Sequence, residues 1–228
     1  MKAIYLYPVL ALLFLNSCSY RYQVFDIKSE EVISETGDYF LYENDDLEIY
    51  YDYWTEGGYP VFKIHNRRND TLFLNLAKSN FKVNGVAIDY YNTTYTAEEY
   101  ERMRPFPLPP VVAIQPRRSY QLNGFPISWR WERIKNKPGY VRFEQNNSPI
   151  HFGNFLTYYF DDENIDYRVE NNFWIGKIKK YKRKEFNEFK QRHDIKSNKF
   201  YVYRYDGTDS AEFWADTVLS VMEVLLLF

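Results

Sequence analysis

The sequence predicts a mainly β protein that folds as an antiparallel sandwich, and three observations support this prediction. Aromatic residues are in excess, since 18 Phe, 5 Trp and 23 Tyr make up 20% of the 228 residues, and such side chains favour pleated, half-buried strands. They fall mostly at alternate positions within short runs, which is the pattern of a strand with one buried face. Turn residues separate the runs at short intervals and helical patterns are few, as in antiparallel sandwiches.

The strand-like runs begin after residue 46. Residues 47–54 alternate and are closed by Gly57-Gly58, and a polar turn over 66–70 separates the next two runs. Asn84-Gly85 is the strongest hairpin signal because both turn residues accept a positive φ. In order, the predicted strands cover residues 47–54, 59–65, 71–76, 81–83, 86–88, 111–114, 119–122, 140–143, 155–160, 172–178 and 200–203.

Three segments have helical character. Thr96 and Glu99 form a capping box, which predicts a short helix over 96–103, and the prolines that follow it up to residue 110 favour an extended loop. A basic stretch over 182–192 predicts a second helix. The apolar run 213–228 contains Asp216 and Glu223 and is short for a membrane span. It predicts a C-terminal helix packed on the sandwich, with a second membrane contact as the alternative.

The N-terminus has the three regions of a secretory signal. Lys2 supplies a positive charge, and an apolar run from Ala3 to Leu15 is too short to cross a bilayer. Leu15-Asn16-Ser17-Cys18 resembles the lipobox of bacterial lipoproteins. The resemblance implies that residues 1–17 are a cleaved signal peptide and that Cys18 carries a diacylglyceryl thioether and an acylated amine, with chains such as palmitate. The alternative is an ordinary cleaved signal, or a short uncleaved anchor, with Cys18 incidental.

The cysteine count agrees with a lipidated residue. Cys18 is the only cysteine, so an intramolecular disulfide is excluded. Three acyl chains would make attachment effectively permanent at about 0.8 kcal/mol per buried methylene. No Asp and no acidic run follow Cys18, which favours the outer membrane facing the periplasm. The predicted organisation is a signal peptide over 1–17, a lipidated tether over 18–37 and one β-rich domain over 38–228.

The segment from Val61 to Tyr91 resembles uncharacterised immunoglobulin-like β-sandwich lipoproteins of the bacterial envelope. It contains an apolar strand, a polar turn with Asn66 and Asp70, a second strand and the Asn84-Gly85 turn. The resemblance implies an antiparallel immunoglobulin-like sandwich, here with one or two short helices and a C-terminal helix. It implies no activity, because those proteins carry no catalytic motif.

Two groups of residues are candidate binding sites. One is basic and would contact anionic headgroups or a polyanionic glycan, although a solvated outer face is the alternative. The other consists of rings that would stack on a sugar or peptide, although packing in the core is the alternative; Trp129 and Trp131 would share one strand face. The basic residues are Lys179, Lys180, Lys182, Arg183 and Lys184, and the rings are Trp54, Trp129, Trp131 and Trp174.

The sequence predicts no metal, no cofactor and no enzymatic activity. His65, His151 and His193 are far apart in the chain and lack metal-type spacing. The acidic run 161–166 fails as a calcium loop because Tyr167 stands where such a loop needs glycine. A nucleophile elbow and a phosphate loop are both absent from the sequence.

The expected function is a non-enzymatic binding or assembly module that meets the membrane through its lipid and binds envelope proteins or glycans. The alternative is a glycan-binding protein or glycan hydrolase at the cell surface or in the periplasm. A hydrolase would also need two carboxyl groups about 5 to 9.5 Å apart. The formal net charge of −2 gives no argument for nucleic acid as a partner.

Overall fold

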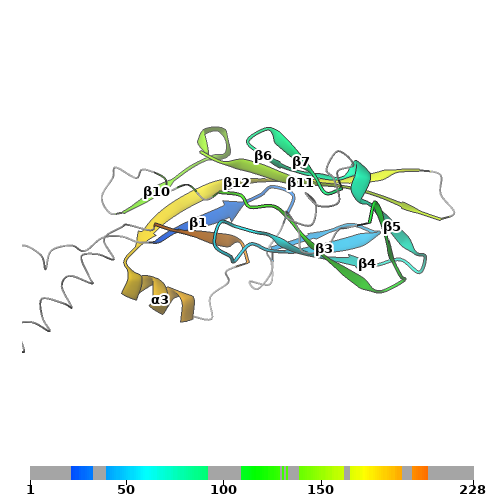
Figure 1. Cartoon of the computed structure of the whole chain (residues 1–228), viewed down its shortest axis with the longest axis horizontal. Helices are drawn as coiled ribbons and strands as arrows, with labels where there is room; N and C mark the ends of the chain where they lie inside the picture. Colours follow the sequence, from blue (N-terminus) through cyan, green and yellow to red (C-terminus); the bar gives the residue numbers. More distant parts are fainter. Residues whose placement is uncertain are drawn as a thin grey trace, which may run out of the picture.

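Two antiparallel β-sheets pack on each other in a sandwich-like arrangement (Figure 1). The computed structural model describes residues 22–32, 40–91, 109–128, 130, 132, 139–161, 165–191 and 197–204. The mainly β, antiparallel architecture predicted from the sequence is confirmed in these residues.

The larger sheet has the order β13-β1-β12-β11-β5-β8, with β10 beside β12, β6 beside β11, and β7 beside β6. Its strands are β1 (Tyr22–Lys28), β5 (Leu72–Asn75), β6 (Asn80–Val83), β7 (Val86–Asp89), β8 (Val111–Ile114), β10 (Tyr140–Arg142), β11 (His151–Phe160), β12 (Tyr167–Tyr181) and β13 (Lys199–Tyr203). The smaller sheet has the order β2-β3-β4-β9. Its strands are β2 (Phe40–Glu43), β3 (Leu47–Asp52), β4 (Val61–Asn66) and β9 (Ser119–Asn123).

The remaining regular structure in the described residues is short. It consists of the helix α3 (Arg183–Gln191) and two single 3-10 turns, η1 (Leu76–Lys78) and η2 (Gln145–Asn147). The helix predicted over 182–192 is therefore confirmed as α3, whereas the helices predicted over 96–103 and 213–228 lie outside the described residues. Among the helical segments that are described, none is long and apolar enough to cross a membrane.

The hydrophobic core lies between the sheets and is largely aromatic. Tyr51 and Tyr53 of the smaller sheet and its following loop meet Phe152 and Phe173 of the larger sheet. The Tyr51–Phe173 and Tyr53–Phe152 ring centroids are 5.2 and 5.6 Å apart, with interplanar angles of 70° and 72°. Edge-to-face pairs of this kind contribute about 0.5 to 1.5 kcal/mol each beyond the area that they bury. Much of the aromatic excess is thus used in core packing.

A buried hydrogen-bond network crosses this core. The Tyr51 hydroxyl donates to the Asn171 side-chain oxygen, and the Asn154 amide donates to the Tyr51 oxygen at 3.3 Å. Tyr90 donates to the Asn154 side-chain oxygen at 2.8 Å. These two asparagines interrupt the apolar pattern of β11 and β12, which is why the sequence predicted only residues 155–160 and 172–178 of strands that are longer.

The hairpin at Asn84-Gly85 is confirmed. Asn84 and Gly85 have φ values of 48° and 83°, and Val83 pairs with Val86 across the turn. Positive φ at both central residues defines the tight turn whose twist matches that of the flanking strands.

Residues 22–28 form a strand, so the tether predicted over 18–37 is wrong in this part. β1 lies between β12 and β13 and pairs with both. Val24, Phe25 and Ile27 are buried. Because Val24 and Phe25 are adjacent and point to opposite faces, the segment is buried on both sides and lacks the strict alternation that identified other strands.

The outer edge of β13 is covered by the loop that follows β3. The Tyr201 N–H donates to the Thr55 carbonyl at 3.2 Å, and the Gly57 N–H donates to the Tyr201 carbonyl at 2.9 Å. Tyr201 and Glu56 form an isolated parallel bridge at the same place. The loop therefore uses both backbone hydrogen-bonding groups of Tyr201, and Tyr201 stands opposite Val24 of β1 on the other side.

Asn66 joins the two sheets where the chain passes from β4 to β5. Its buried amide donates to the carbonyls of Asp70 and Ile114 at 2.8 and 3.0 Å, and its side-chain oxygen accepts the Arg68 N–H at 2.9 Å. One side chain thus satisfies backbone groups from the crossing loop and the buried carbonyl at the end of β8.

We expect Asn66→Ala to lower the free energy of unfolding by about 2 to 4 kcal/mol, because it leaves the buried Ile114 carbonyl and partly buried backbone groups of the crossing loop without this partner. Urea unfolding followed by tryptophan fluorescence measures the change. Asn69→Ala is the matched control, since Asn69 is an exposed asparagine in the same loop. Equal effects of the two substitutions would contradict the joining role of Asn66.

Candidate functional site

Three chain segments meet at one end of the larger sheet. Tyr22, the first residue of β1, pairs with Tyr181 at the end of β12 and with Tyr203 at the end of β13. The helix α3 begins at Arg183, two residues after β12 ends. The start of β1, the ends of β12 and β13, and α3 are therefore neighbours (Figure 1).

Aromatic side chains hold α3 against this end of the sheet. Phe186, the buried residue of α3, stacks on Tyr22 with centroids 3.9 Å apart and an interplanar angle of 4°. Phe189 stacks on Tyr181 at 5.2 Å and meets the edge of Trp54 at 5.7 Å. The helix is thus anchored by its apolar side, and its polar side faces outward.

The register of the sheet gathers cations on one face. Paired residues of neighbouring strands point to the same face. Arg142 of β10 pairs with Lys177 of β12, Lys177 pairs with Asp26 of β1, and Asp26 pairs with Lys199 of β13. Lys179 stands one position further along β12 on the same face, 4.5 Å from the Tyr181 ring centroid.

Asp26 is the carboxylate within this row. The Lys177 ammonium lies 3.9 Å from its carboxylate. Burial raises the pKa of Asp26 above its ordinary value of 3.8, although Lys199, Lys177 and Lys179 act in the opposite direction. One carboxylate offsets only part of the positive charge of the several lysines around it.

The N-terminus of α3 carries three further cations. Lys182 immediately precedes the helix, and Arg183 and Lys184 are its first two residues. The Glu185 carboxylate accepts the Lys182 backbone N–H at 3.2 Å, as an acidic residue in a first turn should. The cations, in contrast, lie at the positive end of the helix dipole, where positive charge is unfavourable.

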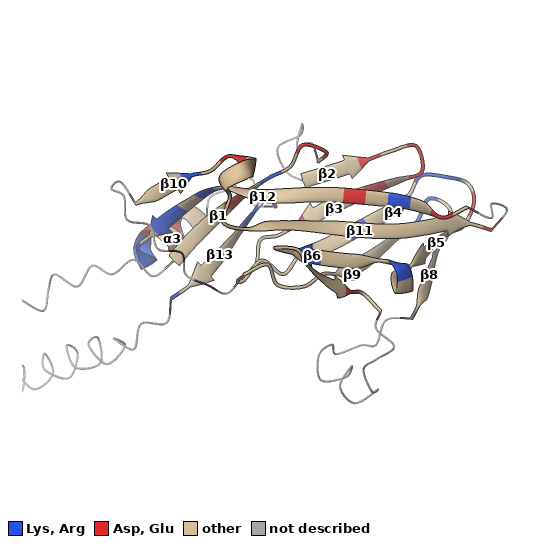
Figure 2. Cartoon of the chain, turned by 90° about the horizontal axis from the view of Figure 1, so that it is seen from above, with Lys and Arg blue, Asp and Glu red and all other residues tan. Residues whose placement is uncertain are grey.

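We call this surface the basic end. Figure 2 shows its blue segments on α3 and on the adjoining strand ends. Ion pairs between described residues include none of the three cations at the start of α3. The basic end consists of Arg142, Lys177, Lys179, Lys182, Arg183, Lys184 and Lys199.

The structure brings together four of the five predicted basic residues. Lys179, Lys182, Arg183 and Lys184 belong to the basic end. Lys180 does not, because it pairs with Gln23 and therefore points to the opposite face of the sheet from Lys179.

Sequence reasoning missed Arg142 and Lys199, which come from separate strands. Only the strand register places them beside Lys177 and Asp26. Lys177 stands two residues before Lys179 in the sequence. Because alternate residues of a strand share a face, strand alternation could have added it to the predicted basic residues.

The predicted stacking rings have different surroundings. Trp54 is half-buried beneath α3. Trp174 is only 9% exposed, and its indole nitrogen has no hydrogen-bond partner among the described residues. Burial leaves little of the Trp174 ring to stack on a ligand. Trp129 and Trp131 lie outside the described residues.

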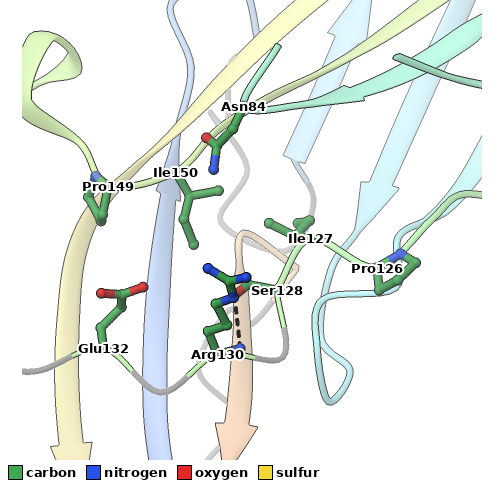
Figure 3. Close-up of a pocket in the computed structure, with 8 residues that line it drawn as sticks. All are labelled: Asn84, Pro126, Ile127, Ser128, Arg130, Glu132, Pro149 and Ile150. Atoms are coloured by element: carbon green, nitrogen blue, oxygen red, sulfur yellow. Dashed lines mark hydrogen bonds between the residues drawn. The ribbon is translucent and has the colours of Figure 1, made fainter. Parts of the chain in front are cut away.

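A cleft lies between the 126–132 segment and the loop before β11 (Figure 3). Its volume is about 470 Å³. The side chains of Arg130 and Glu132 extend into it from one side, and that of Asn84 from the other. Its lining residues are Asn84, Pro126, Ile127, Ser128, Arg130, Glu132, Pro149 and Ile150.

A buried side chain fixes one wall of this cleft. The Gln23 amide donates to the Glu132 carbonyl at 2.6 Å, and the Gln23 side-chain oxygen accepts the Glu132 N–H at 2.8 Å. Gln23 is fully buried. It therefore holds the backbone of Glu132 as a neighbouring strand would.

The histidines do not converge on a site. His65 contacts the Ser119 hydroxyl at 3.1 Å, and His151 contacts the Gln145 carbonyl. His193 lies outside the described residues. In the described ranges, no group of three His, Cys, Asp or Glu side chains is placed to hold a metal ion.

No family model, no curated protein and no solved structure matches this chain. The arrangement of the residues themselves is therefore the basis for any statement about function.

We expect the triple variant Lys182→Glu/Arg183→Glu/Lys184→Glu to unfold with a free energy about 1 kcal/mol higher than that of the unchanged protein. Acidic residues at a helix N-terminus are favoured by the dipole, whereas the present cations are not. Chemical denaturation measures the change. The exposed residues Lys63, Arg118 and Arg168, each changed to Glu, form the control, for which we expect a change within about 0.5 kcal/mol.

Proposed function

We propose that this chain is a lipid-anchored protein of the bacterial envelope that acts as a binding or assembly module. The observation that carries the proposal is the position of β1, which begins at Tyr22, four residues after Cys18. The lipobox-like sequence ending at Cys18 supplies the anchor, and the sheet begins almost at once. Fully extended, four residues span at most about 14 Å. A lipid on Cys18 would therefore hold this end of the domain at the membrane surface.

The scaffold is an immunoglobulin-like sandwich, and the anchor lies in the outer membrane with the domain in the periplasm. The cleft beside Arg130 and Glu132 is the binding surface for an envelope protein. The charged side chains of Arg130 and Glu132 on one of its walls support a polar partner. The two hydrogen bonds from Gln23 to the Glu132 backbone (the Gln23 clamp) support a preformed site, since a wall held by buried hydrogen bonds needs little ordering on binding.

The anchor is tested by Cys18→Ala. We expect this variant to lose incorporation of labelled palmitate and to retain the signal peptide, because cleavage before Cys18 follows lipid attachment in the family that the lipobox resembles. Gel autoradiography and the intact mass of the purified protein measure both effects. The neighbouring Ser19→Ala is the control and should keep the label. A Cys18→Ala variant that still incorporates palmitate would refute the anchor.

A second candidate is binding of an envelope glycan in the same cleft. The observation that favours it is the position of Arg130, which lines the cleft and stands between Trp129 and Trp131 in the sequence. Arginine and aromatic rings recognise sugars through hydrogen bonds and stacking.

Retention of the mature protein on immobilised cell-wall glycan tests this candidate. If the cleft binds glycan, Arg130→Ala and Trp129→Ala/Trp131→Ala should each abolish retention, because they remove the donors and the rings. Arg118→Ala removes an exposed arginine that does not line the cleft and should not affect it. Retention that persists in all variants, or that is absent from the unchanged protein, would exclude the cleft as a glycan site.

A further inference from the structure

We propose that the basic end docks on the anionic headgroups of the bilayer that carries the lipid anchor. This inference rests on the proposed lipid anchor, and it adds the orientation of the domain and the chemistry of the membrane surface that it recognises. The basic end is then a contact surface between protein and membrane, distinct from the cleft.

The chain between the anchor at Cys18 and the start of β1 is short. Tyr22 lies within about 14 Å of Cys18 along the chain. Tyr22 pairs with Tyr181, and Lys182 and Arg183 follow directly. Paired strands place such residues about 5 Å apart. The cations at the start of α3 can therefore reach the membrane surface when Cys18 is embedded in it.

The basic end carries a positive net charge. The segments that form the basic end, together with the rest of α3, contribute the carboxylates Asp26, Glu185 and Glu188, so cations outnumber carboxylates there. Bilayer headgroups act on charges within about one Debye length, roughly 8 to 10 Å. A connection that spans at most about 14 Å allows the basic end to come within that distance of the headgroups. Juxtamembrane cations are attracted to anionic headgroups in this way.

The start of α3 carries charges of the sign that is unfavourable at a helix N-terminus. Lys182, Arg183 and Lys184 stand at the positive end of the α3 dipole, which lowers the stability of the isolated domain. Such a local conflict is expected where residues serve a function other than folding. An anionic surface outside the domain would compensate for it.

The C-terminal chain leaves from the same place. Tyr203, the last residue of β13, pairs with Tyr22, and the apolar run over 213–228 follows in the sequence. The lipid attachment residue Cys18 and the apolar C-terminal run therefore both connect to the fold at the basic end, which is the arrangement expected if this end faces the membrane.

Hydrogen–deuterium exchange of the lipidated mature protein on vesicles tests the docking. The protein is reconstituted in phosphatidylcholine vesicles with either no anionic lipid or about 30 mol% phosphatidylglycerol, whose anionic headgroups attract Lys and Arg near the surface. We expect amides of residues 177–191 to exchange more slowly on the anionic vesicles only, and the difference to disappear in 1 M salt.

Matched charge variants show which residues are responsible. Lys182→Glu/Arg183→Glu/Lys184→Glu should lose the protection on anionic vesicles while remaining folded, because acidic residues suit the start of α3. Lys63→Glu/Arg118→Glu/Arg168→Glu changes the net charge equally and should keep the protection. Equal loss in both triple variants would overturn a local site and indicate a response to net charge.

The remaining outcomes separate the docking from the anchor. A mass without the lipid adduct overturns the proposed anchor, and with it the geometry used here. A lipidated protein whose residues 177–191 are equally protected on both kinds of vesicle, or on neither, keeps the anchor and overturns the docking.

Discussion

The pairing of β1 with β12 is the constraint on which the rest of the molecule depends. It runs from Tyr22↔Tyr181 to Lys28↔Trp174, with a shift between Asp26 and Ile27. On one face it brings Phe25 to the core, where its ring stacks on Phe200. On the other face the same ladder aligns Asp26 with lysines and provides Tyr22 as the platform for α3. Core, basic end and cleft wall all follow from one register.

The strands with one buried face and the tight turn could be predicted from the sequence. Asn84-Gly85 could be predicted because its backbone requirement is local. β1 could not, since it is buried on both faces and shows no period of two. The ends of β11 and β12 were missed for a related reason. Asn154 and Asn171 are polar residues in the core whose partners, Tyr51 and Tyr90, are distant in the chain.

In the candidate site, too, residues that are close in the sequence could be predicted, whereas residues brought together by strand pairing could not. The charges from Lys179 to Lys184 are consecutive and could be seen in the sequence, and alternation alone separates Lys180 from Lys179. Arg142 and Lys199 join them only through strand pairing. The Gln23 clamp on Glu132 was equally hidden, because a glutamine that replaces a strand neighbour leaves no pattern around it.

The loop that covers β13 has a consequence for how densely such a protein can be displayed. Molecules confined to a surface meet far more often than molecules in solution, and a β protein with an open strand edge would then add neighbouring copies to its sheet. At Tyr201 that route is closed, because Thr55 and Gly57 already occupy its backbone donor and acceptor. Crowding on a surface is therefore less able to start aggregation at this edge, which lies beside the basic end.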